Sequence, residues 1–340
     1  NKGHFCLDSS DRLKSFSEKL ATGWEEEYYE YRRKWTENPS NKIVGEYPLL
    51  VDLELASVCN LKCPMCYTIT DEFKQKVTKG FMDFDLYKRI IDEIANKVYA
   101  IRISFRGEST MHANFVECIE YAKKSGIKEI STLTNGANLH GTNLERIIKA
   151  GIDWITISID GTGSTYEKIR KPISFQKIVN NVKEIHEYKI KNNLKKPVIK
   201  IQGIWPAIRE NPELYYKTFS PISDLVAFNP LIDFVSRDDE SIIVYEDNFS
   251  CPQFYQRLVI GSDGKCLLCT NDESGKKIVG DVNYQTVHEI WHGEILQEVR
   301  SKHNKKDGFK CLNVCKECYY PRKAKVDETA SVEGRTIFIE

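Results

Sequence analysis

The sequence lacks an excess of either charge. Its 340 residues include 49 Lys and Arg and 49 Asp and Glu, so the formal net charge is zero. Nucleic acids and anionic membranes attract proteins mainly through positive charge, so neither is expected as the main partner. The sequence also lacks a run of about 18 apolar residues and any segment that resembles a secretory signal. We therefore expect no membrane span and a cytoplasmic location.

An even number of cysteines is also lacking. There are 11, which is odd and high for a cytoplasmic chain. A reducing compartment argues against a disulfide framework, and clustering at short spacings favours metal binding. Three clusters and two separate residues make up the set: Cys59, Cys63 and Cys66; Cys251, Cys266 and Cys269; Cys311, Cys315 and Cys318; Cys6 and Cys118.

Strand-like and helix-like segments alternate through the middle of the chain. Six strands, from "LLVDLELA" to "DLVAFNP", alternate with helical segments over residues 48–235. Such alternation is typical of a parallel sheet with helices outside. Six units predict an α/β fold, a partial (β/α)6 barrel. In such barrels, active-site groups lie on loops at the C-terminal ends of the strands.

The flanking regions are different. Residues 1–47 are predicted to form an N-terminal helical segment, with one long helix over residues 11–38 whose aromatic face packs against a domain. Residues 236–322 contain short strands, an Asp-Gly turn and six cysteines, and are predicted to form a small cysteine-rich α+β domain. Residues 323–340 form a polar tail, in which "TIFIE" is expected to dock on a sheet edge.

The stretch "ELASVCNLKCPMCYTIT" follows the first barrel strand and spaces Cys59, Cys63 and Cys66 as C-x3-C-x2-C. A structural zinc ion takes four ligands, whereas three thiolates on a four-iron cluster leave one iron open to a small molecule. Zinc with a fourth ligand elsewhere is the alternative. With this loop at the end of its first strand, the sequence resembles the radical S-adenosylmethionine (radical SAM) enzymes.

The resemblance implies a [4Fe-4S] cluster on the three cysteines, with its open iron chelated by S-adenosylmethionine. One electron, from a reductant such as flavodoxin or ferredoxin, would then cleave S-adenosylmethionine to a 5′-deoxyadenosyl radical that abstracts hydrogen from a small-molecule substrate. The residue before the third cysteine is usually aromatic in this family. Here it is Met65, whose expected contact to adenine is mostly through its backbone.

Later motifs follow in the order of the family. "FRGEST" stands where the family has Gly-Gly-Glu, so Gly107 should allow close backbone approach and Glu108 should receive the amino group of S-adenosylmethionine. A carboxylate at the N-terminus of the next helix is the alternative role of Glu108. The resemblance assigns further cofactor contacts to Asn135 in "TLTNG", Ser158 and Asp160 in "SIDG", Arg170 in "YEKIRKP" and Gln202 on the fifth strand. The alternative for Arg170 is a surface cation.

A second motif begins at "CPQFYQRLVIGSDGKCLLC" and continues at Cys315-Lys-Glu-Cys318. It resembles the auxiliary-cluster module called SPASM, or its shorter form, Twitch, which both begin C-x(9–15)-G-x4-C. The C-x2-C-x5-C-x3-C run of the longer form is absent. The resemblance therefore implies one auxiliary [4Fe-4S] cluster on Cys251, Cys269, Cys315 and Cys318.

Two cysteines leave alternatives open. Cys266 rivals Cys269, because Gly261 precedes Cys266 by four residues just as Gly264 precedes Cys269. The Asp-Gly turn favours Gly264. Cys311 is spare in this assignment, and a zinc ribbon built from the same residues is the alternative to a cluster.

A fully ligated cluster is suited to moving electrons, as a dehydrogenation requires. Twitch proteins include a dehydrogenase of aminoglycoside biosynthesis that oxidises a secondary alcohol on a carbocyclic sugar. This chain also resembles a group found among polysaccharide and nucleotide-sugar biosynthesis genes. We therefore expect a radical SAM oxidoreductase of dehydrogenase type, acting on a sugar or nucleotide-linked sugar. Arg106, Gln202 and Asn229 are candidate lumen residues, and Trp205 either stacks on a sugar or is a core aromatic.

Other functions use much of the same machinery. A sugar dehydratase or epimerase would form the same radical. A peptide epimerase or cross-linker would need a peptide-docking element, and the first 40 residues lack the strand-and-winged-helix pattern of such a module. A simple iron–sulfur electron carrier is disfavoured because an open iron is a liability unless something binds there.

Overall fold

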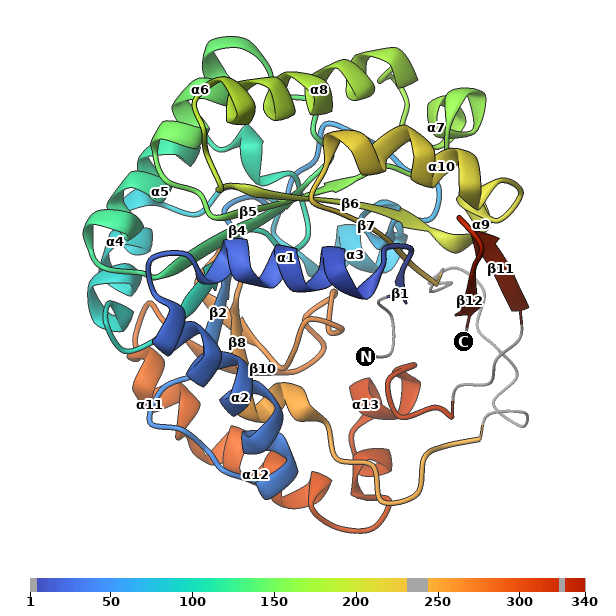
Figure 1. Ribbon diagram of the computed structural model, residues 1–340. Coiled ribbons are helices and arrows are strands. Elements are labelled where there is room, and N and C mark those ends of the chain that lie inside the picture. The colour runs from blue at the N-terminus through green and yellow to red at the C-terminus, as the bar shows by residue number, and fades with distance from the viewer. Residues whose placement is uncertain (1–4, 231–243, 324–327, 340) are drawn as a thin grey trace.

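The computed structural model describes residues 5–230, 244–323 and 328–339. Its main sheet has the strand order β1-β7-β6-β5-β4-β3-β2-β8-β9-β10 (Figure 1). The pairs from β2 to β7 are all parallel, which confirms the predicted partial (β/α)6 barrel. These strands are β2 (Leu50–Leu53), β3 (Ala100–Arg102), β4 (Glu129–Thr134), β5 (Trp154–Ser158), β6 (Val198–Ile204) and β7 (Leu225–Asn229).

Helices cover the outer side of this sheet (Figure 1). They are α4 (Phe84–Ile94), α5 (Phe115–Lys124), α6 (Gly141–Lys149), α7 (Gly163–Ile169), α8 (Phe175–Lys191), α9 (Trp205–Ile208) and α10 (Pro212–Phe219). Asp83 begins α4 by accepting from two backbone N–H groups. Gly126 and Gly151 follow α5 and α6 at φ 98° and 96°, the left-handed conformation that glycine adopts most easily.

The two faces of the barrel strands differ in polarity. Registered partners on neighbouring strands point to the same side, and one such row is Ile155, Ile199 and Thr132 on the helix-covered face. The opposite, inner face carries polar rows. Two of them comprise Asp52, Arg102 and Ser131, and Thr156 with Lys200. The inner face is therefore where polar ligands can be held.

The N-terminal segment is two helices, so the prediction of one long helix is wrong. Helix α1 (Ser10–Ala21) and helix α2 (Glu25–Asn41) are separated by a short break in which Gly23 has φ 88°. That conformation is costly for other residues and interrupts the helix. The predicted aromatic packing is confirmed, because Trp24, Tyr28 and Tyr31 share a core cluster with Val198 on the inner face. The two helices thereby close the N-terminal end of the barrel.

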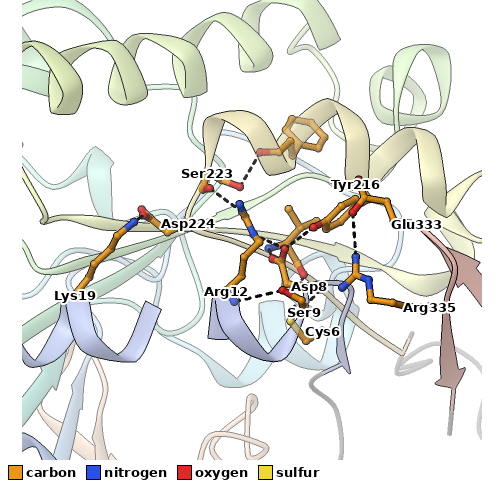
Figure 2. Close-up of polar contacts among 12 residues, drawn as sticks. Cys6, Asp8, Ser9, Arg12, Lys19, Tyr216, Ser223, Asp224, Glu333 and Arg335 are labelled. Atoms are coloured by element: carbon orange, nitrogen blue, oxygen red, sulfur yellow. Dashed lines mark hydrogen bonds and ion pairs between the residues drawn. The ribbon is translucent and has the colours of Figure 1, made fainter. Parts of the chain in front are cut away.

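A strand that the sequence did not indicate, β1 (Phe5–Cys6), pairs antiparallel with β7. Asp8 holds the following turn in place (Figure 2). Its buried carboxylate accepts from the Tyr216 hydroxyl at 2.9 Å and from the Val226 N–H at 2.5 Å, and it pairs with Arg12 at 2.5 Å. The segment from β1 to Asp8 is thus fastened to α10 and β7.

The C-terminal region continues the barrel sheet. Strand β8 (Arg257–Ile260) runs parallel to β2, with Leu50 opposite Arg257. It leads through the Asp-Gly turn, where Gly264 has φ 86°, to β9 (Lys265–Leu267) and then β10 (Ile278–Asp281). Helices α11 (Val287–Trp291), α12 (Glu294–His303) and α13 (Asn313–Glu317) complete this region.

The tail does not dock on an edge of the main sheet, so that expectation is wrong. Strands β11 (Glu328–Val332) and β12 (Arg335–Ile339) form a separate antiparallel hairpin. The hairpin is held from the barrel side: the Trp205 indole N–H donates to Glu328 at 2.6 Å, and the Glu333 N–H donates to Glu213 at 2.7 Å. The tail strand takes β11 as its partner and adds no strand to the main sheet.

Candidate active site and cysteine clusters

The three-cysteine loop leaves the C-terminal end of β2, as predicted, and is followed by α3 (Asp71–Lys76). Cys63 is buried, Cys66 is half-buried and Cys59 is exposed. Burial around the sulfur, followed by the nearby groups Glu108, Cys63 and Cys66, raises the pKa of the Cys59 thiol to about 11. Because a thiolate at Cys63 or Cys66 disfavours ionisation of Cys59, the three thiols lie near one another. They are therefore close enough to bind one positively charged group.

Gly107 joins the loop after β3 to the cysteine loop. Its N–H donates to the Ala56 carbonyl at 3.1 Å, and the next N–H, of Glu108, donates to the Val58 carbonyl at 2.8 Å. A Cβ at Gly107 would lie 2.2 Å from the Val58 oxygen, so no other residue fits without moving the backbone. The close approach predicted for this glycine is therefore present, and the partner it approaches is the cysteine loop.

Glu108 is buried and fully engaged within the chain. One carboxylate oxygen accepts from the Asn135 N–H at 2.7 Å, and the other accepts from the hydroxyls of Thr134 at 2.7 Å and Thr110 at 2.6 Å. It also accepts from the Thr110 N–H, which is the helix-capping role given above as the alternative. Asn135 in turn donates from its side chain to Asn60 in the cysteine loop at 2.7 Å. Glu108 and Asn135 thus tie the ends of β3 and β4 to that loop.

Asp160 and Arg170 form a buried ion pair beside the cysteine loop. Arg170 donates to one Asp160 oxygen at 2.7 and 2.6 Å, and their side chains are 15% and 1% exposed. Burial raises the pKa of the Cys63 thiol, and the Arg170 charge opposes that rise. Arg170 is therefore a partly buried cation next to a cysteine, and not a surface cation.

The remaining predicted cofactor contacts lie on or near the inner face. Ser158 ends β5, and its registered partner Gln202 lies in the C-terminal half of β6. Asn229 ends β7, opposite Ile204. Met65 is half-buried in the cysteine loop and packs against the main core. Strand ends thus place these side chains around the same opening of the barrel.

Arg106 has a partner that the sequence did not indicate. It makes a two-pronged ion pair with Glu54 at 2.6 and 2.5 Å, and the two side chains are 5% and 0% exposed. Its third nitrogen donates to the Glu273 carbonyl at 3.2 Å, while the Ser262 N–H donates to Glu54 at 3.0 Å. The pair therefore fastens the barrel to the C-terminal region.

The four predicted auxiliary cysteines lie together. Burial raises the pKa of the Cys269 thiol, and Cys251, Cys318 and Cys315 each raise it further. The neighbours of Cys266 are different. Burial is the largest cause of the raised pKa of its thiol, and the carboxylates of Asp281, Asp263 and Glu93 also raise it.

Cys311 is exposed and lies near Lys302, and it is not among the groups that shift the pKa of the Cys315 thiol. Together with the positive φ of Gly264, this arrangement supports the predicted set of four thiols.

Hydrogen-bond donors surround these sulfurs. The Asn271 amide donates to the Cys318 sulfur at 3.3 Å, and the Tyr320 N–H donates to it at 3.4 Å. His303 contacts the Cys315 sulfur at 3.3 Å through Nε2. N–H groups aimed at sulfur favour the ionised thiolate, which is the form that binds metal.

Both cysteine sets fit iron–sulfur clusters in donor chemistry. Within residues 5–230, 244–323 and 328–339, no three Cys, His, Asp or Glu side chains converge as ligands of a single metal ion do. Cluster ligands bind separate irons, so they surround the cluster and do not meet at one point. A set of three gathered thiols and a set of four provide that arrangement.

Replacing Cys269 by alanine is expected to abolish the auxiliary cluster, whereas replacing Cys266 or Cys311 is not. Cys269 lies near the other three thiols, whereas the charged neighbours of Cys266 are carboxylates. Iron per chain after anaerobic reconstitution should fall from about eight to about four in Cys269→Ala and stay at about eight in the other two variants. The reverse pattern would move the glycine anchor from Gly264 to Gly261.

Trp205 and Lys200 show what strand patterns leave undecided. Trp205 is 6% exposed and packs on Phe228 at 4.9 Å between ring centres. Of the two alternatives for Trp205, the structure confirms the core aromatic and not the residue that stacks on a sugar. Lys200 was missed, although "VIKIQGI" alternates and places it on the same face as Gln202. Lys200 is 7% exposed, burial lowers its pKa to about 8, and none of the described carboxylates pairs with it.

Comparisons with known proteins agree with this site. Residues 53–201 match the family model of the radical SAM superfamily. Residues 53–201 are therefore a radical SAM domain. Residues 251–319 match the model of the SPASM iron–sulfur cluster-binding domain. These two domains imply a [4Fe-4S] cluster, S-adenosylmethionine and auxiliary iron–sulfur binding as cofactors.

Two curated relatives show how far the similarity extends. A tungsten-containing aldehyde ferredoxin oxidoreductase cofactor-modifying protein of Pyrococcus furiosus is 31% identical over 150 residues, which cover 38% of this chain and 40% of that protein. An S-adenosylmethionine-dependent nucleotide dehydratase of Flammeovirga pacifica is 27% identical over 132 residues, covering 38% and 45%. The matched segments thus span less than half the length of either relative.

Two solved structures share the fold. BtrN in complex with AdoMet and 2-DOIA has a TM-score of 0.52 at 17% identity, covering 81% of this chain and 94% of BtrN. Streptococcus suis SuiB bound to its precursor peptide SuiA has a TM-score of 0.57 at 14% identity, covering 86% and 76%. In the described part of this chain, none of the helices combines the length and hydropathy that a membrane crossing requires.

Proposed function

We propose that this radical SAM protein cleaves S-adenosylmethionine reductively and oxidises a sugar or nucleotide-linked sugar by two electrons. The observation that carries the proposal is the gathering of four thiols in the C-terminal region, with Cys266 and Cys311 apart from them. Four thiolates leave no iron of a cluster open, so such a cluster is suited to accepting an electron. The proposal includes a cytoplasmic location and a reductant that resembles flavodoxin or ferredoxin. It divides the chain into an N-terminal helical segment (1–47), the barrel (48–235), the auxiliary-cluster domain (236–322) and a tail (323–340).

We assign Cys59, Cys63 and Cys66 to the barrel cluster and Cys251, Cys269, Cys315 and Cys318 to the auxiliary cluster. When bound, these groups and S-adenosylmethionine supply a hydrogen-abstracting radical and an electron acceptor. The chain's own residues position the cofactor. Arg170 provides a cation beside Cys63 that suits a carboxylate, while Glu108 and Asn135 hold the loops that surround the cofactor.

The inner face supports a polar substrate. Ser158, Gln202 and Asn229 bring hydroxyl and amide groups to the strand ends, and such groups suit the hydroxyls of a sugar. The word "nucleotide" in the name of one similar protein points the same way. The carboxylates and guanidinium groups of Glu54 and Arg106 are occupied with each other, so they contribute structure here and not substrate contacts.

Lys200 is the proposed acceptor of the substrate hydroxyl proton, which it takes up in its neutral form, the minor form at pH 7 because its pKa is about 8. Replacing it by methionine should stop product formation while leaving 5′-deoxyadenosine release. The same change should stabilise the fold at pH 7, because burial lowers the Lys200 pKa from 10.5 to about 8 and the charged amine is held at a cost.

Between pH 8 and 10.5 the unfolded chain binds more protons at this position, so the stability of the wild type rises with pH there. The gain in Lys200→Met should be about 3 kcal/mol at pH 7 and vanish near pH 10.5. Urea unfolding at several pH values measures it. Lys189→Met is the control, because Lys189 pairs with Asp224 at 2.6 Å and its loss should destabilise. An unchanged product yield in Lys200→Met would contradict the assignment.

Substrate mass and isotope transfer test the proposal. A panel of nucleotide-linked hexoses deuterated on the ring would be incubated anaerobically with protein, reductant and S-adenosylmethionine. Deuterium should appear in 5′-deoxyadenosine, and the product should lose two hydrogens. Loss of water would indicate a dehydratase, an unchanged mass an epimerase, and either would contradict oxidation. Turnover of a peptide alone would contradict the sugar assignment.

A further inference from the structure

We infer that His303 raises the reduction potential of the auxiliary cluster by donating a hydrogen bond to the Cys315 sulfur. The inference rests on the proposed ligand set. His303 ends α12, is 2% exposed and lies between two of the proposed ligands. Its Nδ1 accepts from the backbone N–H of Cys251 at 3.3 Å, and its Nε2 lies 3.3 Å from the Cys315 sulfur.

The backbone contact decides which nitrogen carries the proton. A neutral imidazole has one N–H and one acceptor nitrogen. The Cys251 N–H can only donate, so Nδ1 is the acceptor and Nε2 carries the hydrogen. That hydrogen points to the Cys315 sulfur. The main chain of one cysteine therefore sets the donor that faces the sulfur of another.

Packing keeps the ring in this orientation. Phe254 contacts it edge-on at 4.7 Å between ring centres, and Phe249 lies at 6.4 Å. Helix α12 is held by Arg300, which donates to the carbonyls of Phe254 at 2.9 Å and Trp291 at 2.8 Å. With its ring enclosed by these aromatics, His303 has no room to turn Nε2 away from the sulfur without repacking the core.

The hydrogen bond affects how readily the auxiliary cluster accepts an electron. A reduced cluster carries one more negative charge than an oxidised cluster, so an N–H donor at sulfur stabilises the reduced form more. The potential rises, and the cluster becomes a better acceptor for a substrate electron. His303 is thus a positioning residue for redox tuning and does not touch the substrate.

The test uses the full chain in which Cys59, Cys63 and Cys66 are all replaced by alanine, so that only the auxiliary cluster is present. Its potential would be measured by a redox titration followed by electron paramagnetic resonance. His303→Phe should lower the equilibrium constant for reduction about tenfold, which is about 59 mV for one electron. His303→Gln keeps an N–H donor and should restore part of that loss.

His292→Phe is the matched control, because the His292 ring pairs with the Glu46 carbonyl at 2.9 Å and not with a sulfur. It should leave the potential unchanged. An intact cluster with the parent potential in His303→Phe overturns the inference. Loss of iron in both His303 variants also overturns it, because the histidine would then serve assembly. Absence of iron in the parent protein would instead show that the ligand assignment is wrong, and the inference would fall with it.

Discussion

Replacing Cys59, Cys63 and Cys66 together by alanine is expected to abolish 5′-deoxyadenosine release and to leave one cluster. These thiols are the proposed ligands of the barrel cluster, and without an iron that binds S-adenosylmethionine no electron can reach its sulfonium bond. Iron after anaerobic reconstitution should fall from about eight to about four per chain. The auxiliary site should survive. The thiols that shift the pKa values of Cys251 and Cys269 are auxiliary cysteines, and the three barrel cysteines are not among them.

The measurements are iron analysis and chromatography of the nucleoside product under a chemical reductant. Cys118→Ala is a suitable control, because Cys118 is fully buried on α5 in the aliphatic core and joins neither set. Two results would contradict the expectation. Loss of all iron in the triple variant would mean that the second set is not an independent site. A wild type with a confirmed cluster but no 5′-deoxyadenosine would contradict the radical chemistry.

The second large effect is expected for Cys315→Ala, which should keep 5′-deoxyadenosine release but lose the oxidised product. The barrel cysteines follow β2, and the groups beside them, Glu108, Asn135 and Arg170, follow β3, β4 and β5, so the barrel site does not include α13. Hydrogen abstraction should still occur, and deuterium from the substrate should still reach the nucleoside. The substrate radical would then lack an acceptor for its remaining electron, because the ligand set is incomplete.

Mass spectrometry of the substrate pool and of 5′-deoxyadenosine from the same reaction gives both readouts. In the wild type, one nucleoside and one product lighter by two hydrogens should form per S-adenosylmethionine. If Cys315→Ala continues to form product at the wild-type rate, the auxiliary cluster does not accept the electron and the dehydrogenase proposal fails. Cys266→Ala serves as the control, since Cys266 faces carboxylates and not the other thiols.

Local patterns predicted the strands well. Strands β4, β5 and β6 are rich in β-branched residues, and a run such as "WITISI" can form a strand without knowledge of its neighbours. The N-terminal helices were harder to predict. The aromatic residues on both sides of Gly23 pack against the inner face of the barrel, and the helix breaks at Gly23. The position of that face relative to the helices cannot be read from the sequence. The tail strand was placed wrongly because a short apolar run does not reveal which partner strand it will join.

The sequence by itself determined the chemistry of the two sites. The spacing of Cys59, Cys63 and Cys66 and the order of the following motifs depend on neighbouring residues, and such short-range constraints are visible in the chain. Only the tertiary structure decided which distant groups meet. Arg106 meets Glu54 across 52 positions, and His303 joins the Cys251 backbone to the Cys315 sulfur. Contacts of this kind are set by how strands and helices pack, because chain spacing does not fix the distance between residues that far apart.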